Sequence, residues 1–390
     1  MSAPLPIDRV AAVRMLADFV GIPTLNPPGQ EKPGAEFLAR ELERRGFPAQ
    51  LTEISPGRAN VTARLRGSGD APALLFNGHI DVVPPGEVPW KHPPFGAHVE
   101  DGRLYGRGSA DMKGGLAAML VALEALAASG RRLKGDVIFS AVADEETSAT
   151  GSIRLVSDGL LKGVGAVVIG EPTGFHVYIA QKGTFWLEVE TLGVTAHGSM
   201  PHLGRNAIMD MQAVLEEMAK IDMPEGPDPL LGRATLNVGM IHGGVGPNVV
   251  PDSCRASLDI RLPAGVSQRG MMRELEAAVE RAGTRRPGLT AHIRNTGSRV
   301  AVATTAGERI VQLGIALCKE QLGLSLQPQP TPGFATDASV LCSDPPIPYI
   351  IIGPGREELA HKPDEYLLID DYMKAIVLYA TIAERYLGFA

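Results

Sequence analysis

Cysteine is scarce in this 390-residue chain, which contains only Cys254, Cys318 and Cys342. The three residues are far apart and odd in number, and no C-x-x-C pair occurs, so the sequence predicts no disulfide framework. We interpret all three as small apolar residues of the core. A reducing cytoplasm is the compartment that fits this cysteine content best.

The chain also lacks segments that would direct it to a membrane. Residues 1–8 contain no basic region followed by an apolar run, so we expect no signal peptide. No uninterrupted apolar stretch is long enough to span a bilayer. The formal net charge is −7 at pH 7, and an acidic surface repels both nucleic acid and anionic lipid. These features predict a cytoplasmic protein whose main partner is neither nucleic acid nor a membrane.

Several common catalytic motifs are missing as well. The sequence has no G-x-S-x-G elbow, no H-E-x-x-H helix and no G-x-x-x-x-G-K-[ST] loop. Residues 106–111 superficially match the G-x-G-x-x-G turn of dinucleotide-binding proteins. Asp111 stands where the third glycine belongs, however, and its charge would repel a pyrophosphate. We therefore reject a dinucleotide site.

What the sequence does contain is an alternation of strand-like and helix-like segments. Near-continuous apolar runs predict buried strands at 73–76, 137–143, 166–169 and 347–352. Helices are predicted at 35–45, 116–128, 308–320 and 370–385. Apolar strands that alternate with helices are typical of a largely parallel sheet covered on both faces.

The middle of the chain has a different pattern. Phe185, Leu187 and Val189 occupy alternate positions, as in a half-exposed strand, and the following elements give the order β-α-β-β-α-β of a ferredoxin-like unit. We therefore predict an α/β fold with a doubly wound, mostly parallel-sheet catalytic domain in two parts, residues 1–183 and 295–390. Between them we predict an inserted ferredoxin-like α+β domain at residues 184–294.

Metal-capable side chains follow three of the predicted buried strands. His79 and Asp81 follow the first, residues 144–146 (Asp-Glu-Glu) follow the second, and Glu171 follows the third. Ligand sites in open α/β sheets form outside the carboxyl ends of the strands. Carboxylates gathered there repel one another, and a divalent cation relieves that repulsion. Imidazole and carboxylate together suit zinc, cobalt or manganese, and the many acids favour a paired site.

Each of these motifs can also be explained by an ordinary structural role. Asp81 is expected to accept a hydrogen bond from His79 and thereby orient it, although a His-x-Asp pair on a surface is equally ordinary. Asp111 is either a helix N-cap or a carboxylate that bridges two metals. The acidic triplet is either a solvated turn or a metal ligand beside a general base.

In their order and combination, five stretches resemble the dinuclear-zinc amidohydrolase and peptidase family that includes acetylornithine deacetylase, succinyl-diaminopimelate desuccinylase, aminoacylase and glutamate carboxypeptidases. The resemblance spans most of the chain. The stretches are 77–84 (NGHIDVVP), 106–115 (GRGSADMKGG), 144–146 (DEE), 170–173 (GEPT) and 360–365 (AHKPDE).

This resemblance implies two bound divalent ions, zinc in the first place, with cobalt or manganese as alternatives. His79 and Glu171 would bind one ion, and Glu146 and His361 the other. Asp111 would bridge the two. Without the resemblance, His361 reads as an ordinary loop residue beside Lys362-Pro363.

The resemblance also implies roles around the metals. Glu145 would be the general base and Asp81 would orient a ligand. The stretch 195–199 (TAHGS) is similar to the family's lid motif, which implies that His197 stabilises an oxyanion in a neighbouring subunit, and hence a homodimer. The alternative for His197 is a polar loop residue.

Three further residues are candidates for contact with substrate. Asn248 and Arg261 would hold a substrate carboxylate, for which a guanidinium is well shaped, although Arg261 could equally be an exposed strand residue. Thr336 belongs to a turn that resembles a substrate-contacting one, in which Asp337 could instead cap a helix. The histidines at 92, 98, 176, 202, 242 and 292 match no family role, and we interpret them as ordinary surface or core residues.

The function expected on these grounds is metal-dependent hydrolysis of the amide bond of an N-acyl amino acid. A dipeptidase or carboxypeptidase of the same family is the alternative. Glu171, where other members have Asp, leans toward the deacylases. A metal-dependent binder of small molecules without turnover is the alternative from a different class.

Overall fold

The computed structural model describes residues 5–390, which form two compact units. The first unit runs to Ile179 and is completed by Thr304–Pro330 and Thr336–Ala390. The second consists of Ala180–Ala303 with Thr331–Ala335. The predicted insertion lies within the second unit, and its boundaries at residues 184 and 294 stay predictions.

A twisted sheet forms the centre of the first unit, although its last strand, β13, and the end of β8 fall within the residue range of the second unit. Its order is β1-β2-β6-β3-β7-β15-β8-β13, with β14 beside β8. The strands β6, β3, β7 and β15 are parallel, whereas β1 and β2 add antiparallel strands at one edge and β8 does so at the other. The strands are β1 (Gln50–Ser55), β2 (Arg58–Leu65), β3 (Ala73–His79), β6 (Val137–Val142), β7 (Val164–Ile169), β8 (Tyr178–Gln181), β13 (Val302–Ala303), β14 (Gln329–Pro330) and β15 (Tyr349–Ile351).

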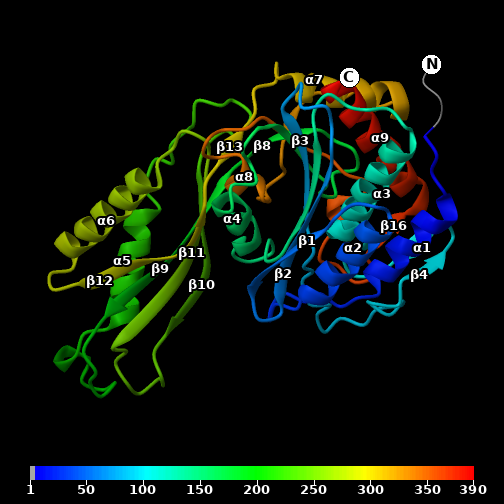
Figure 1. The fold of residues 1–390 in the computed structure, drawn as a ribbon. Coiled ribbons are helices and arrows are strands. Elements are labelled where there is room, and N and C mark those ends of the chain that lie inside the picture. The colour runs from blue at the N-terminus through cyan, green and yellow to red at the C-terminus, as the bar shows by residue number, and fades with distance from the viewer. Residues whose placement is uncertain (1–4) are drawn as a thin grey trace. The chain divides into compact units, whose positions relative to one another are not determined.

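Helices cover both faces of this sheet. Figure 1 shows α2, α3 and α9 on one face and α4 and α8 on the other. The helices of this unit are α1 (Arg9–Val20), α2 (Lys32–Arg44), α3 (Gly114–Ala128), α4 (Thr150–Ser157), α7 (Arg309–Leu322), α8 (Ala338–Leu341) and α9 (Ile369–Leu387). None of the helices within residues 5–390 combines the length and hydrophobicity needed to cross a membrane.

The central strands are apolar because side chains on both of their faces are covered. All seven residues of β3 and all six of β6 are buried, and Phe76 and Phe139 are among the largest fully buried side chains. Helix α3 is likewise buried on most sides, since it packs against both the sheet and α9. The predicted doubly wound α/β fold is therefore confirmed.

A small second sheet of the first unit lies beside the chain's last helix. Its order is β16-β5-β4, all antiparallel. The strands are β4 (His98–Glu100), β5 (Arg103–Tyr105) and β16 (Tyr366–Leu368). Through this sheet, the hairpin at residues 98–105 pairs with the segment that follows His361.

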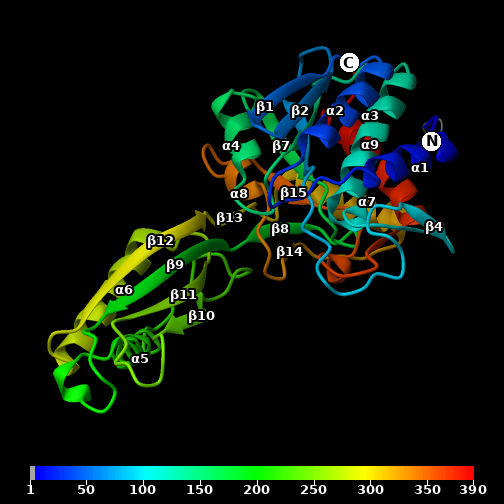
Figure 2. The same cartoon turned by 90° about the horizontal axis from the view of Figure 1, so that it is seen from below.

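The second unit has the ferredoxin-like arrangement that its element order predicts. Its four-stranded antiparallel sheet has the order β10-β11-β9-β12, visible in Figure 2, and both helices contact the sheet and each other. The apolar side chains that alternate along β9 and β11 are buried against these helices. The elements are β9 (Gly183–Leu192), α5 (Ala207–Met218), β10 (Thr235–Gly243), β11 (Ser253–Leu262), α6 (Gln268–Arg285) and β12 (Thr290–Arg299).

Close packing of α3 against β7 requires a glycine near the start of the helix. A Cβ on Gly115 would lie 2.0 Å from the carbonyl oxygen of Gly170, a backbone atom that cannot rotate away. We expect Gly115→Ala to lower the free energy of unfolding by ~1–3 kcal/mol, as overpacking does. In contrast, Gly283→Ala in α6 has nothing within 4 Å of the added methyl group and should stabilise by about 1 kcal/mol. Denaturant unfolding followed by circular dichroism measures both, and equal effects would contradict this account.

Candidate active site

Three neighbouring parallel strands end in the predicted site residues. Strand β3 lies between β6 and β7, and His79 is its last residue. Glu145 and Glu146 follow β6, and Glu171 follows β7. Because the carboxyl ends of parallel strands meet at one edge of the sheet, these side chains gather there.

Asp111 reaches the same place from a turn that precedes α3. This turn, η1 (Ser109–Lys113), is held by the buried carboxylate of Glu365, whose Oε1 accepts hydrogen bonds from the backbone N–H groups of Ala110 (2.9 Å) and Asp111 (3.0 Å). The other oxygen of Glu365 accepts from Arg107 at 2.6 Å. Lys113, not Asp111, occupies the N-cap position of α3, so the N-cap reading of Asp111 is wrong.

The two carboxylate oxygens of Asp111 face two different histidines. Oδ1 lies 3.2 Å from Nε2 of His79, and Oδ2 lies 3.4 Å from Nε2 of His361. Nε2 of His361 is in turn 3.0 Å from Oε1 of Glu146. A carboxylate that offers one oxygen to each side has the geometry of a bridging ligand.

Two groups of side chains in the described part of the chain could each hold an ion here. In one, ligand atoms of His79, Asp111 and Glu146 lie within 4.8 Å of one another, and in the other those of His79, Glu145 and Glu171 do. In the second group, Nε2 of His79 lies 3.8 Å from Oε2 of Glu171. The predicted ligands on both sides of Asp111 are therefore brought together.

The charges of this cluster are out of balance without a cation. Burial raises the pKa of Glu171 well above its usual value, and nearby Asp111 and Glu145 add to this effect against the opposing charge of His79. Burial and the charge of Asp111 raise the pKa of Glu146 to about 7. Acids that resist ionisation at neutral pH indicate too much negative charge for the space.

The two histidines of the cluster offset only part of this excess negative charge. Hydrogen bonds with Asp111 and Glu146 raise the pKa of His361 to about 10. Burial opposes charge on His79, but Glu171 and Asp111 outweigh it and raise the pKa of His79 well above 6.5. The same two histidines hold the pKa of Asp111 below its usual value despite burial. Divalent cations would relieve this imbalance of charge, and this donor set of imidazole and carboxylate fits zinc, cobalt or manganese.

Asp81 orients the site differently from the sequence-based expectation. Nδ1 of His79 lies 2.9 Å from the backbone carbonyl oxygen of Asp81, whereas the nearest carboxylate oxygen is 3.6 Å away, beyond hydrogen-bond distance. The expected carboxylate hydrogen bond is therefore wrong. Strand β3 ends at His79, so the alternation of side chains no longer applies two residues later. The Asp81 carboxylate instead accepts from the backbone N–H groups of Glu145 (3.2 Å) and Glu146 (3.0 Å).

The acidic triplet is not a solvated turn. Asp144 is 3% exposed and Glu145 6% exposed. Asp144 adopts a positive φ of 72° and its carboxylate accepts from Thr147, from Thr150 and from Arg58. These bonds shape the loop that presents the two glutamates.

Sequence reasoning missed a layer of polar side chains behind the loop. Asn26 donates to Asp81 at 2.8 Å and to Asp144 at 3.1 Å, and Arg58 pairs with both Asp144 and the fully buried Glu31. Burial and the charge of Asp81 raise the pKa of Glu31 to about 7. Nothing near these residues in the sequence signals their role, since each acts on a segment far along the chain.

In the second unit, His197 and Asn248 lie on adjoining segments. The N–H of Gly198 donates to the carbonyl oxygen of Asn248 at 2.8 Å, and His197 forms a bridge with Val249. The His197 side chain is exposed, and its Nδ1 lies 2.8 Å from the hydroxyl oxygen of Ser199. The TAHGS motif and the 246–249 turn thus form one local structure.

The remaining substrate candidates have internal partners. Arg261 donates from Nε and Nη2 to Asp259, at 2.9 Å and 3.0 Å, and from Nη1 to the carbonyl oxygen of Gly333. Thr336 is buried, and its hydroxyl accepts from the N–H of Ala338. Asp337 precedes α8 but makes no side-chain cap; its Oδ1 accepts from the hydroxyl of Ser152 at 2.7 Å.

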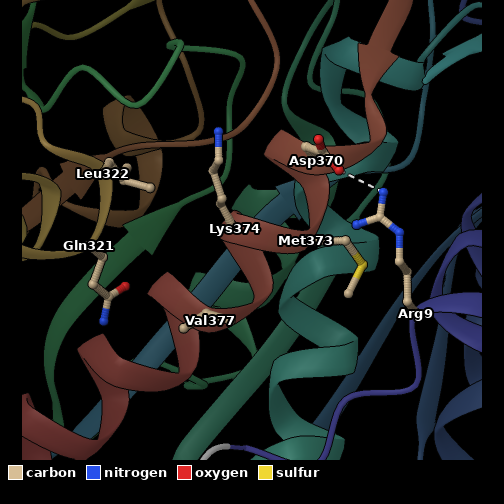
Figure 3. A pocket seen from close by; sticks show the side chains of 7 residues that line it. All are labelled: Arg9, Gln321, Leu322, Asp370, Met373, Lys374 and Val377. Atoms are coloured by element: carbon tan, nitrogen blue, oxygen red, sulfur yellow. Dashed lines mark hydrogen bonds and ion pairs between the residues drawn. The ribbon is translucent and has the colours of Figure 1, made fainter. Parts of the chain in front are cut away.

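A pocket of about 380 Å³ on the outer helices offers a different environment. Figure 3 shows Asp370 paired with Arg9 there, at 2.6 Å, so its one acidic side chain is already engaged. The carboxylate cluster at the strand ends is therefore the better candidate for catalysis. The pocket is lined by Arg9, Gln321, Leu322, Asp370, Met373, Lys374 and Val377.

Comparison with known proteins assigns the chain to one family of metal-dependent hydrolases. The model of Peptidase family M20/M25/M40 matches residues 75–385. A probable succinyl-diaminopimelate desuccinylase of Staphylococcus epidermidis is 29% identical over 403 residues, which cover 96% of this chain and 97% of the relative.

Solved structures share the fold over nearly the whole chain. An M20-family metallo-carboxypeptidase of Sulfolobus solfataricus superimposes with a TM-score of 0.82 at 22% identity, covering 97% of this chain and 99% of that one. A dinuclear metal-binding peptidase of the same family from Bacillus subtilis has a TM-score of 0.75 at 16% identity, covering 98% and 99%.

Proposed function

The chain belongs to Peptidase family M20/M25/M40 and is a metal-dependent hydrolase, and on that premise we propose that it cleaves the amide bond of an N-acyl amino acid. The observation that carries the proposal is the position of Asp111, with one oxygen toward His79 and the other toward His361. This arrangement fits a pair of ions better than one.

The residues proposed to hold the ions form two sets that share one member. His79 and Glu171 belong to the first ion, Glu146 and His361 to the second, and Asp111 to both. Zinc is the metal proposed, with cobalt or manganese as substitutes, because all three accept nitrogen and oxygen ligands. The B. subtilis neighbour that binds a dinuclear metal centre supports the pair.

Bound ions would supply Lewis acidity, which lowers the pKa of water and polarises an amide carbonyl. Glu145 is the proposed general base. It is buried among the ligands but belongs to neither proposed ligand set, and the Asp81 carboxylate holds its backbone N–H. From that position Glu145 would take a proton from the attacking water and pass it to the departing nitrogen.

The acyl amino acid class rests on the desuccinylase relative and on Glu171, which leans toward the deacylases of the family. Asn248, Arg261 and Thr336 are proposed to contact the substrate. For Arg261 this requires that a substrate carboxylate compete with Asp259, because both would use the same guanidinium donors.

A second copy of the chain is proposed as partner, with its His197 completing the oxyanion site of the first. The edge of the second unit's sheet supports this: within residues 5–390, β10 pairs with β11 alone, and its Val238, Met240 and Ile241 are 40–57% exposed. An exposed apolar edge strand is a ready template for pairing with another chain.

Sedimentation velocity tests the dimer. We expect the wild-type protein to sediment as a dimer and Met240→Lys to shift it to monomer with loss of turnover, since a charge at a paired apolar edge blocks association. Val10→Lys, at another exposed apolar position, serves as control and should stay dimeric. A fully active monomer would rule out the role of His197 in a neighbouring subunit.

A peptidase is the second candidate, favoured by the structural similarity to a carboxypeptidase. Both candidates are tested by removing metal with a chelator, adding back zinc or cobalt, and assaying acetyl-amino acids, succinyl-amino acids and dipeptides. We expect chelation to abolish hydrolysis and metal to restore it, with N-acyl amino acids turned over fastest. Faster cleavage of dipeptides would favour the peptidase, and ligand binding without any product would favour a non-catalytic binder.

A further inference from the structure

A second group of metal-capable side chains lies away from the carboxylate cluster and shares no residue with it. His92, His98 and Glu100 each offer one ligand atom, and the three atoms lie within 4.8 Å of one another. His98 and Glu100 are the ends of β4, and His92 comes from the loop before it. The sequence had given His92 and His98 no role.

His92 is the fixed member of this group. It is 8% exposed, and its ring stacks against those of His98 and Tyr105, with centroid separations of 4.8 and 4.2 Å. Its Nε2 is buried and has no hydrogen-bond partner within residues 5–390, and it lies 3.6 Å from Oε2 of Glu100. A buried ring nitrogen without a partner is costly, and a ligand that accepts its lone pair removes that cost.

The other two members are free to move toward it. His98 is exposed, and the Glu100 side chain is 46% exposed. Ligand atoms of a tetrahedral zinc ion lie about 3.3 Å apart, because the metal–ligand distances are about 2.0–2.2 Å. Rotation of two exposed side chains provides the contraction from 4.8 Å without any change in the buried histidine.

We propose that His92, His98 and Glu100 form a separate binding site for one transition-metal ion, with water as the fourth ligand. Two imidazoles and one carboxylate select zinc, copper, nickel or cobalt over magnesium and calcium, which prefer oxygen. Lys91, whose Nζ lies 3.8 Å from Glu100, is exposed and can turn into solvent when the metal binds.

The site lies on a segment that also touches the loop of His361. The backbone N–H groups of Lys91 and His92 both donate to Oδ1 of Asp364, at 2.8 and 3.0 Å. A metal bound to His92 would therefore restrict the motion of the segment that holds Asp364, three residues after His361. The proposal does not depend on the reaction catalysed, because it concerns metal stoichiometry alone.

Equilibrium dialysis against buffered zinc, with metal content per chain measured by mass spectrometry, tests the proposal. We expect the wild-type protein to take up one more zinc ion per chain than His98→Ala or Glu100→Gln. Loss of an outer partner alone weakens metal affinity ~10–100-fold, so loss of a ligand should weaken this site by at least about 100-fold. Both replaced side chains are exposed, which leaves the fold intact.

Matched controls separate this site from adventitious binding. His292→Ala removes an exposed histidine from another strand, and Glu87→Gln removes an exposed acid from the preceding loop. Both should keep the wild-type zinc content. In a cobalt-loaded sample, His98→Ala should also lose one set of visible absorption bands. Equal metal content and equal affinity in the wild type, His98→Ala and Glu100→Gln would overturn the proposal.

Discussion

Replacing Glu145 by glutamine is expected to leave both metals in place and to reduce kcat by ~10⁴-fold, the upper end of what general acid–base groups contribute. The amide has nearly the same shape but cannot take a proton from water or return one to the leaving nitrogen. Because one residue serves both transfers, no neighbour replaces it. Its backbone N–H, and with it the bond to Asp81, is unchanged by the substitution.

Metal analysis and steady-state kinetics on the same zinc-loaded sample check this result. Glu87→Gln makes the same chemical change at an exposed position and should have wild-type kcat. A metal-loaded Glu145→Gln enzyme with normal turnover would end the assignment of Glu145 as the base. A variant without metal would instead place Glu145 among the ligands, as its position beside His79 and Glu171 permits.

The sheet and three segments of the site follow from local sequence patterns. Strands buried on both faces are apolar at every position, so β3, β6 and β7 stand out in the sequence, and a polar residue that follows such a strand marks its carboxyl end. Parallel neighbours place those ends at one edge. This is why His79, Glu146 and Glu171 could be grouped before any coordinates were known.

The other half of the site has no such local signature. His361 lies in a loop with a positive φ of 63°, and Asp111 in a turn fixed by Glu365, which is 254 residues away in the chain. Only resemblance to a family placed His361 with the others, whereas for Asp111 the sequence left a bridging carboxylate and a helix N-cap as alternatives. Asn26 and Arg58 were not found at all, because their hydrogen bonds connect segments whose proximity is a product of the complete fold.

The strands β1 and β2 were missed for a related reason. Gln50–Ser55 is exposed or half-buried throughout, so its sequence lacks an apolar face to reveal it, although it pairs antiparallel with β2, with a register shift between Glu53 and Ser55. Arg261 is a residue whose type alone suggested a role, and that role stays a prediction. A guanidinium suits a substrate carboxylate, yet here its donors already meet Asp259, two positions along the same strand.

Asp111→Asn is the second substitution with a large expected effect, and it should remove the metals themselves. Asp111 is the one carboxylate that faces both His79 and His361, so its loss takes a charged ligand from each ion at once. Asparagine keeps the shape of the side chain but supplies a single neutral oxygen, which leaves the two cations to repel each other without a bridge. We expect turnover at least ~10³-fold below wild type, comparable to loss of a major electrostatic stabiliser.

In a His98→Ala background, which removes the separate site proposed at His92, metal content after dialysis should fall from two ions per chain to one or none. Circular dichroism should show an intact fold, because the backbone N–H of residue 111 still donates to Glu365. Glu145→Gln is the matched comparison, since it changes a neighbouring buried acid to its amide yet should retain both ions. If Asp111→Asn held two tightly bound metals, the carboxylate would not be the bridge, and the pairing of ligands around it would have to be abandoned.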